Sequence, residues 1–281
     1  MVQGKSPGVR RRLLGKELAK LRKEAGLEFE HVIDELGFSK SKISRIESGA
    51  IGVSIVDAKA LAQLYGADQK KTDWLVRLVR VAKQRGWWHC YMDVVVDWFF
   101  DYVSLEAEAG ALDSFHIDLI PGLFQTSTYA RLLMRSGAPD AADELVEKRV
   151  DLRLSRQKRV HDGDLKVWSI IDEAALRRAV GGTDVQLAQL LHLRKMAELS
   201  NVTLQLLPFA KGQHIAMGTS FSYLKFADYP SVVYVDTLTG GLYLDDEPDV
   251  SRYSLALDHL RASALDPSES FGLLDRVIAE L

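Results

Sequence analysis

The amino-acid sequence predicts an all-α domain of five helices followed by an α+β domain with a mixed sheet. Three observations predict this division. Apolar residues recur every three or four positions up to about residue 85, whereas strand-like and helix-like segments alternate after it. The charge is divided as well, since residues 1–90 hold 18 Lys and Arg against 10 Asp and Glu, and residues 91–281 hold 18 against 29. A length of 281 residues also fits two domains of roughly 150 residues each.

The composition excludes several classes of protein. Hydrophobic residues make up 47% and charged residues 27%, close to the averages for globular proteins, which excludes a wholly disordered chain. The single cysteine, Cys90, permits neither an internal disulfide nor a multi-cysteine zinc site. No segment approaches the roughly 20 apolar residues of a membrane span. We therefore expect a cytoplasmic protein that does not enter the membrane.

The first domain is expected over residues 1–85. Its helices are predicted at residues 8–25, 28–36, 40–48, 55–65 and 69–85 from their apolar spacing. Gly26, Gly37 and Gly49 are placed to end the first three helices, and Ser39 can cap the third. The excess of positive charge in this part of the chain favours nucleic acid as its partner, because phosphate groups attract local rather than global charge.

Residues 32–49 combine a short helix, a glycine-containing turn and a second short helix, which is the helix-turn-helix arrangement. From Leu36 to Gly49 the string Leu-Gly-x-Ser-x-Ser-x-Ile-Ser-Arg-Ile-Glu-x-Gly resembles the XRE-type regulators, the group that includes the lambdoid phage repressors and Cro. The resemblance covers about residues 9–85. It implies a lambda-repressor-like fold whose second motif helix reads base edges in the major groove.

Carried over position by position, the resemblance selects the exposed start of that helix as the base-reading set. The set consists of Lys40, Ser41, Ser44 and Arg45. Lys40 and Arg45 are the strongest candidates, because both can donate hydrogen bonds to guanine O6 and N7. Glu47 is expected to support the following turn rather than to contact DNA.

Phosphate contacts are expected from Lys42 and from a group of arginines. The glutamine that commonly anchors a phosphate in these regulators is replaced here by Phe29. Arginines of the first helix are expected to substitute for it, namely Arg10, Arg11, Arg12 and Arg22.

Residues 86–101 are predicted to form an aromatic-rich connector. Large apolar side chains are concentrated there, which is more typical of a domain or dimer interface than of a cofactor site. The expected interface residues are Trp87, Trp88, Trp98, Phe99 and Phe100. A short recognition helix reads few bases, so a homodimer on a palindromic double-stranded operator is expected.

The second domain is expected over residues 102–281. Helices are predicted at residues 102–111, 127–135, 140–160, 173–180, 184–199, 250–264 and 268–281. Strands are predicted at residues 115–120, 166–171, 202–207, 219–226, 232–236 and 242–244, with Asp172 as an N-cap and a hairpin around residues 239–241. This order of elements indicates an α+β domain with a mixed sheet.

Several strings in this domain resemble the WhiJ-like family of actinobacterial regulators. They are Ile-Pro-Gly-Leu-Phe-Gln-Thr at residues 120–126, Tyr-Ala-Arg at 129–131, Arg153, Arg156-Gln157, Ile-Asp-Glu-Ala-Ala-Leu-Arg-Arg at 171–178, Leu-Leu-Pro-Phe at 206–209 and Val-Tyr-Val at 233–235. The resemblance runs over about residues 102–274. It implies a transcriptional regulator, often discussed as antitoxin-like, whose C-terminal domain binds a small partner protein.

No catalytic, metal-binding or cofactor site is predicted. Ser220, His214 and Asp228 could form a triad only on paper, because no nucleophile elbow surrounds any serine. Histidines are not accompanied by ligands at metal-binding spacing, and the glycine pairs lack the spacing of nucleotide-binding loops.

The expected function is therefore sequence-specific transcriptional regulation, with residues 102–281 receiving a small partner protein or an effector. In the alternative, the second domain is an enzyme or a small-molecule sensor and the first domain only localises it to DNA. A pocket with converging titratable groups would favour that alternative.

Overall fold

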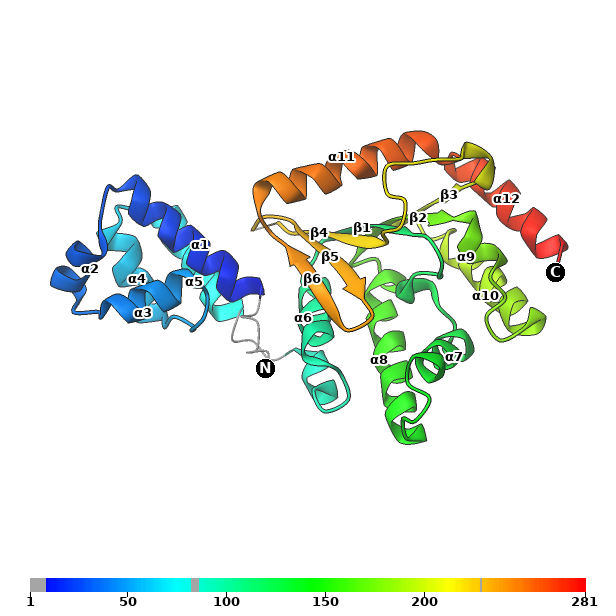
Figure 1. Ribbon diagram of the computed structural model, residues 1–281, viewed down its shortest axis with the longest axis horizontal. Helices are drawn as coiled ribbons and strands as arrows, with labels where there is room; N and C mark the ends of the chain where they lie inside the picture. The colour runs from blue at the N-terminus through cyan, green and yellow to red at the C-terminus, as the bar shows by residue number, and fades with distance from the viewer. Residues whose placement is uncertain (1–8, 82–85, 228) are drawn as a thin grey trace. The chain divides into compact units, whose positions relative to one another are not determined.

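The computed structural model describes residues 9–81, 86–227 and 229–281. The chain forms two compact units, residues 1–86 and residues 87–281 (Figure 1). The aromatic segment expected as a connector, residues 86–101, therefore belongs almost entirely to the second unit. Its backbone is fastened there by Arg149, whose Nε donates to the carbonyl oxygen of Val94 at 2.8 Å.

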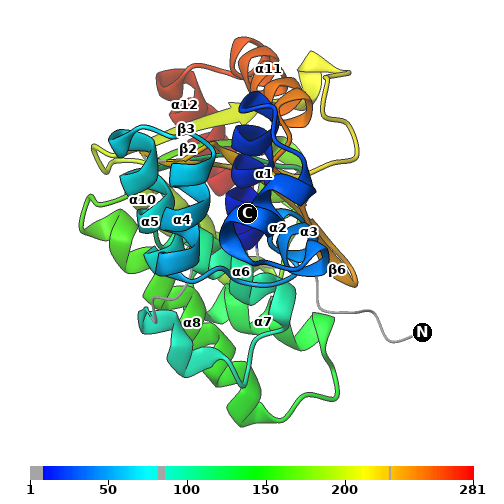
Figure 2. The same ribbon diagram turned by 90° about the vertical axis from the view of Figure 1, so that its left-hand side faces the viewer.

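The first unit contains the five predicted helices. They are α1 (Val9–Glu24), α2 (Phe29–Leu36), α3 (Lys40–Glu47), α4 (Ile55–Leu64) and α5 (Gln69–Val81). The predicted end of the last helix, residues 82–85, lies outside the described residues. Figure 2 shows the α2–α3 pair and the α4–α5 pair on either side of α1. Leu18, Val32, Ile43, Leu61 and Leu75 are almost fully buried between the helices.

Helices α1 and α3 approach each other at backbone distance. A Cβ atom on Gly15 would lie 2.4 Å from the carbonyl oxygen of Ile46. Gly49, which follows α3 with φ of +73°, would place a Cβ 2.8 Å from Cα of Arg12. Any side chain at these two positions would push the helices apart, so the position of α3 is set by main-chain contact.

The second unit begins with a short 3₁₀ helix, η1 (Trp87–Tyr91), and with α6 (Asp97–Glu106). Its strands are β1 (Ala111–His116), β2 (Lys166–Asp172), β3 (Val202–Leu207), β4 (Phe221–Lys225), β5 (Val232–Thr237) and β6 (Gly240–Leu244). The other helical elements are η2 (Gly122–Phe124), α7 (Ser127–Gly137), α8 (Asp143–His161), α9 (Glu173–Arg177), α10 (Thr183–Met196), η3 (Phe209–Lys211), α11 (Glu247–Ser263) and α12 (Pro267–Ala279).

The strands form one mixed sheet in the order β3-β2-β1-β4-β5-β6. The first three strands in the chain are parallel, and the remaining pairings are antiparallel. The predicted all-α domain and α+β domain with a mixed sheet are thus confirmed. Strand β1 lies between the parallel and the antiparallel halves, so its side chains are neighbours of both.

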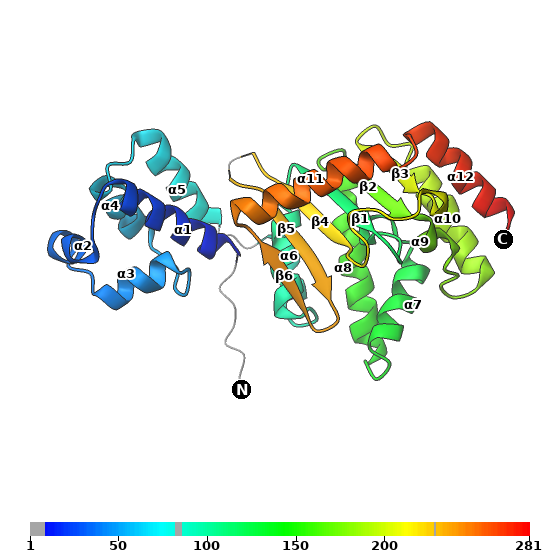
Figure 3. The ribbon, with the colours of Figure 1, turned by 45° about the horizontal axis from the view of Figure 1, so that its top comes forward.

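The two faces of the sheet are covered by different helices. Helix α11 runs along one face, while α6, α7 and α8 lie on the other (Figures 1 and 3). On the α11 side, Phe115, Ile170 and Val233 of the sheet pack with Leu257 and Leu260 of the helix. The opposite face carries the smaller, more polar side chains described below.

Most predicted elements of the second unit differ from those observed by a few residues at an end, and two are displaced as a whole. Helix α6 begins at Asp97 rather than at residue 102, and β1 spans Ala111–His116 rather than residues 115–120. Strand β1 holds Asp113 and Ser114, both buried, so it lacks the apolar alternation that marks a strand in the sequence. The Asp113 carboxylate is paired with Lys225 and Arg261, which makes its burial tolerable.

No helix in the described ranges is long and apolar enough to cross a membrane.

Candidate functional site

Helix α3 presents its polar side chains outward on a short, well-capped helix. The Ser39 hydroxyl accepts a hydrogen bond from the backbone N–H of Lys42 at 3.2 Å, which caps the first turn. Ile43 and Ile46 face the core and are at most 3% exposed. The four residues expected to read bases are all exposed, namely Lys40, Ser41, Ser44 and Arg45.

Both lysines of α3, the exposed Lys40 and the half-buried Lys42, already have neighbours. Lys40 Nζ lies 3.2 Å from Glu30 of α2, and both side chains are 66% exposed, so this pair is weak and readily broken. Lys42 Nζ lies 3.0 Å from Asp57 of α4 and 3.5 Å from the centre of the Phe38 ring. A phosphate at Lys42 would therefore have to compete with Asp57.

Arg22 does not have the free guanidinium that was predicted for phosphate binding. It is 7% exposed, and its Nε and Nη2 donate to the two carboxylate oxygens of Glu47 at 2.7 and 2.9 Å. Its Nη1 donates to the carbonyl oxygen of Leu27. Glu47 raises the pKa of Arg22, mainly through the hydrogen bond. The prediction for Arg22 is wrong, because this arginine fastens α1 to the end of α3.

The remaining predicted phosphate contacts differ in availability. Arg11 is exposed, whereas Arg10 and Arg12 are half-buried and each interacts with other parts of the molecule. Phe29, the residue that stands in place of the usual glutamine, places its ring 4.3 Å below the Arg22 guanidinium carbon. It therefore supports the buried ion pair instead of anchoring DNA.

The predicted aromatic interface is only partly available for contacts with another molecule. Trp88, predicted as a dimer or domain interface residue, is 7% exposed, so little of its surface is available to another chain. Trp98, Phe99 and Phe100 are half-buried. The exposed apolar side chains of this segment are Trp87, Met92 and Val96, at 39%, 56% and 40%.

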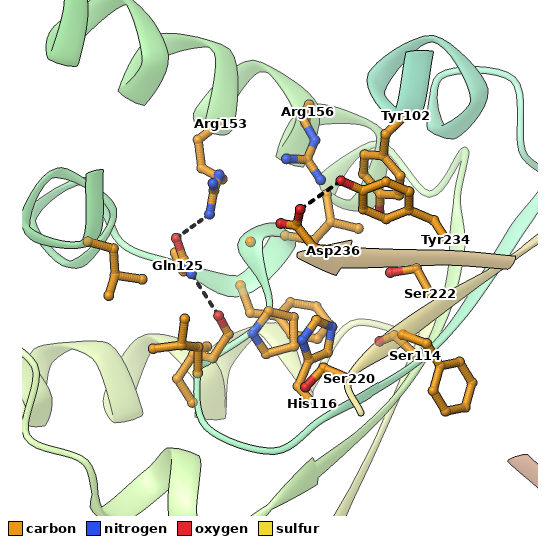
Figure 4. A pocket seen from close by; sticks show the side chains of 18 of the residues that line it. Tyr102, Ser114, His116, Gln125, Arg153, Arg156, Ser220, Ser222, Tyr234 and Asp236 are labelled. Atoms are coloured by element: carbon orange, nitrogen blue, oxygen red, sulfur yellow. Dashed lines mark hydrogen bonds between the residues drawn. The ribbon is translucent and has the colours of Figure 1, made fainter. Parts of the chain in front are cut away.

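The sequence did not predict a pocket of about 680 Å³ in the second unit. It lies between the polar face of the sheet and helices α6, α7 and α8 (Figure 4). A smaller cavity of about 310 Å³ adjoins it and shares Phe99, Met134, Arg153 and Arg156. The polar residues of the larger pocket are Tyr102, Ser114, His116, Asp118, Gln125, Arg153, Arg156, Ser220, Ser222, Tyr234, Asp236 and Thr237.

Small side chains in adjacent strands leave this space open. Ser169 of β2, Ser114 of β1 and Ser222 of β4 are register partners, and Tyr234 of β5 continues the row. The hydroxyls of Ser114 and Ser169 are hydrogen bonded at 3.1 Å. Ser114 and Ser222 line the pocket, and their small side chains in place of the usual large apolar residues remove volume from the sheet face below α8.

Two arginines of α8 reach the pocket, and they are paired differently. Arg156 is fully buried, and its Nε and Nη2 both lie 2.7 Å from the carboxylate oxygens of Glu106. Burial lowers the pKa of Arg156, but the charge of Glu106 and its hydrogen bonds, together with Tyr102 and Tyr234, raise it overall. Arg153 donates a hydrogen bond from Nη1 to Oε1 of Gln125 at 2.6 Å. Burial and the nearby charge of Arg156 lower its pKa to about 10.

Buried glutamines position the loop that carries Gln125. Gln125 Nε2 donates to the carbonyl oxygen of Ile120 at 2.7 Å, and Gln157 Nε2 donates to the carbonyl oxygen of Gln125 at 2.8 Å. Gln189 donates to the carbonyl oxygen of Phe124 and accepts from the backbone N–H of Thr126. The side-chain amide of Gln125 is thereby held toward Arg153.

His116 also lines the pocket, two residues after Ser114 on the same face of β1. Burial, assisted by the charge of Arg153, lowers the pKa of His116 to about 4. Its imidazole is therefore neutral near pH 7. On β5, the Tyr234 hydroxyl donates to Asp236 at 2.9 Å. Burial and the Asp236 charge raise the pKa of Tyr234, so this phenol stays protonated.

The described residues of the possible catalytic triad, Ser220 and His214, do not come together. The Ser220 hydroxyl accepts a hydrogen bond from the backbone N–H of Ile117, and the His214 ring packs against Phe115, which faces α11. Asp228 lies outside the described residues. Within the described part of the chain, no cluster of His, Cys, Asp or Glu has the arrangement to hold a metal ion.

The sequence contained a partial signal for the pocket. Arg153 and Arg156, spaced to share one face of a helix, were part of the family resemblance but had no assigned role. The serines that form the pocket floor could not be found in this way, since Ser114 and Ser222 come from strands that are far apart in the sequence.

Comparison with protein families gives two matches. A model described as "Domain of unknown function (DUF5753)" matches residues 99–276, and one described as "Helix-turn-helix domain" matches residues 13–75. No curated protein and no solved structure matches the chain. The second match covers the helices that position the exposed residues of α3, and the first covers the pocket.

Breaking the Arg22–Glu47 pair is expected to destabilise the first unit strongly. The Arg22→Met substitution would leave the Glu47 carboxylate buried without a partner, at a cost of about 3–5 kcal/mol. The double variant Arg22→Met, Glu47→Leu should lose much less. Glu30→Gln, which breaks the exposed pair with Lys40, is the matched control and should change stability by at most about 1 kcal/mol. Calorimetric unfolding of the full chain measures all three, and equal losses in the single and double variants would contradict the assignment.

His116 is expected to make the second unit sensitive to acid. The folded state holds this imidazole neutral down to about pH 4, whereas the unfolded chain binds the proton near its ordinary pKa of 6.5. Stability should therefore fall as the pH drops from 6.5 to 4, by on the order of 3 kcal/mol at most. Guanidinium chloride unfolding at several pH values should show a smaller acid loss for His116→Asn. The exposed His259→Asn control should behave as the wild type, and an unchanged loss in His116→Asn would contradict the expectation.

Proposed function

Because the chain belongs to the family defined by the Domain of unknown function (DUF5753) and carries a helix-turn-helix domain ahead of it, we propose that it is a sequence-specific DNA-binding transcriptional regulator. The exposed face of α3 carries this proposal. Lys40, Ser41, Ser44 and Arg45 project from a helix whose opposite side is held by Ile43, Ile46 and the Arg22–Glu47 pair. A rigid helix with hydrogen-bonding side chains on one free face is suited to the major groove.

The roles within this face follow from what each side chain already contacts. Arg45 is exposed and makes no ion pair within the described residues, so its whole guanidinium is available to a guanine. Lys40 must leave only the weak contact with Glu30. Lys42, engaged by Asp57, serves the phosphate backbone, where a loosely held ammonium is sufficient.

In this proposal the regulator is a WhiJ-like member of its family and acts as a homodimer on a palindromic site. The motifs of residues 120–126 and 171–178 support the WhiJ-like assignment. The need for a second half-site supports the dimer, because one short recognition helix reads few bases. The exposed Trp87, Met92 and Val96 offer an apolar surface for it.

The second unit has a regulatory rather than a catalytic role in this proposal, and it receives an effector or a small partner protein. The pocket between the sheet and α8 has converging titratable groups, among them His116, Arg153 and Asp236, which is the feature expected of the alternative with a small-molecule sensor. It favours a small-molecule effector over a partner protein, since its volume of about 680 Å³ lies within the usual range for ligand sites. Ser220 and His214 belong to opposite faces of the sheet, which supports binding over nucleophilic catalysis.

Substitutions in α3 test the DNA-reading role. After selection of the preferred DNA from a random pool, Arg45→Ala and Lys40→Ala should each cost about 1–3 kcal/mol of specific binding and relax base preference. Lys42→Ala should weaken binding to all sequences alike. Lys70→Ala removes an exposed lysine from the first turn of α5 and is the charge-matched control. Fluorescence anisotropy measures the affinity of each variant for specific and scrambled duplexes. If the ratio of these two affinities is unchanged in the Arg45 and Lys40 variants, the assignment of the base-reading residues is wrong.

The dimer is tested separately. Light scattering should show two chains per particle at micromolar concentration and two chains per palindromic duplex. Met92→Glu, which places a charge on the exposed apolar surface, should yield monomers with weaker DNA binding. A monomeric wild type that binds a palindrome one to one would exclude this part of the proposal.

A further inference from the structure

Arg153 is the residue of the pocket whose charge is least satisfied. A guanidinium has five N–H donors, and Arg153 uses Nη1 for Gln125. No carboxylate within the described chain lies at ion-pair distance from it. The side chain is half-buried, lines the pocket and points toward Gln125 (Figure 4). A charge withdrawn from bulk water without an anionic partner is unfavourable unless something else supplies one.

Arg156 shows what a purely structural arginine looks like in the same place. It leaves α8 three residues later and enters the same pocket, and Glu106 neutralises it through two hydrogen bonds of 2.7 Å. Phe99 and Tyr102 flank its guanidinium, with ring centres 5.2 Å away. The fold therefore provides an anion for Arg156 and leaves Arg153 with a neutral amide.

The rest of the lining limits the charge that an occupant can carry. After the Arg156–Glu106 pair is set aside, Arg153 is the single positive charge, since the His116 imidazole is neutral. The other charged residues of the lining, Asp118 and Asp236, are exposed carboxylates. They would repel a second negative charge. The site thus suits a monoanion better than a phosphate dianion.

The walls indicate what the anionic group is attached to. Phe99, Phe124, Leu133 and Met134 supply apolar surface around the charged group. The hydroxyls of Ser220 and Ser222 and the imidazole of His116 supply neutral hydrogen-bonding groups on the floor. A pocket with apolar walls, few polar groups and one free guanidinium has the properties of a site for a small organic acid.

We propose that this pocket binds a small organic monocarboxylate, with the carboxylate held by Arg153 and an apolar or aromatic body packed against Phe99, Leu133 and Met134. This inference rests on the proposed function, in which the second unit receives an effector. The planar, forked guanidinium matches the two oxygens of a carboxylate, and the small serine side chains leave room for the body.

The first test compares the two arginines in the unliganded protein. Arg156→Met would leave Glu106 buried and unpaired, and it should lower the melting temperature by roughly 10 °C. Arg153→Met removes a charge that has no anionic partner, so the melting temperature should stay within a few degrees of the wild type. A loss in Arg153→Met as large as that in Arg156→Met would overturn the proposal, because Arg153 would then be a structural residue.

The second test measures binding of matched probes by calorimetric titration of the full chain. The probes are phenylacetate, cinnamate and naphthoate, each beside its primary amide, with inorganic phosphate as the dianion. We expect at least one carboxylate to bind the wild type and its amide to bind roughly 10- to 100-fold more weakly. Arg153→Met should lose this preference, and Arg153→Lys should keep part of it. Arg131→Met breaks the solvent-accessible pair of α7 with Glu147 of α8, away from the pocket lining; it is the control and should bind as the wild type.

Four results would overturn the proposal: no binding of any carboxylate, equal binding of acid and amide, unchanged binding in Arg153→Met, or binding of phosphate alone. These titrations contain no DNA, so they are independent of the α3 substitutions. Negative titrations together with intact base preference would remove the ligand class and leave the proposed regulator. Positive titrations with a wild type that shows no base preference would remove the proposed regulator and leave the ligand class.

Discussion

A guanidinium that is withdrawn from water needs an anionic partner. Each unit of this protein is organised around a buried arginine that is paired with a glutamate. Arg22 and Glu47 join the first helix to the end of the third, with side chains only 8% and 10% exposed. Arg156 and Glu106 join α8 to α6 beside the sheet, at 5% and 4%. Such pairs add little net stability, since dehydration of the ions offsets their attraction. These pairs fix the relative position of the two helices that each of them joins, because a shift of either helix would leave a buried charge unpaired.

The pocket of the second unit follows from a local departure from this pattern. Ser114 and Ser222 on two neighbouring strands leave the sheet face hollow, and hydrogen-bonded glutamines hold the loop at residues 120–126 beside it. Arg153 reaches into that hollow with an amide as its partner. Folding alone would favour a larger apolar side chain at these positions. Positions at which a protein keeps residues that reduce its stability are typically positions that bind a ligand.

The sequence predicted the first unit well because its information is local. Helical spacing, glycine stops and the serine cap lie within a few residues of what they determine, so the sequence predicted all five helices and, for the first four, nearly correct ends. The role of Arg22 was not found, because its partner Glu47 is 25 residues away in the sequence. A basic residue in a helical segment is otherwise expected to be exposed to solvent. In the second unit, β1 was displaced because its paired Asp113 and buried Ser114 break the apolar pattern. The pocket depends on strand register, which a single sequence does not contain.

The contact between α1 and α3 separates two properties that are often linked. The position of α3 is fixed by the bare backbone at Gly15 and Gly49 and by a buried ion pair, and none of these lies on the outward face. The outward residues Lys40, Ser41, Ser44 and Arg45 take no part in that contact. They can be exchanged during evolution, or by an engineer, with little loss of folding free energy. The same scaffold can therefore be redirected to a new operator by a few surface substitutions, while a change at either glycine would disable every such variant at once.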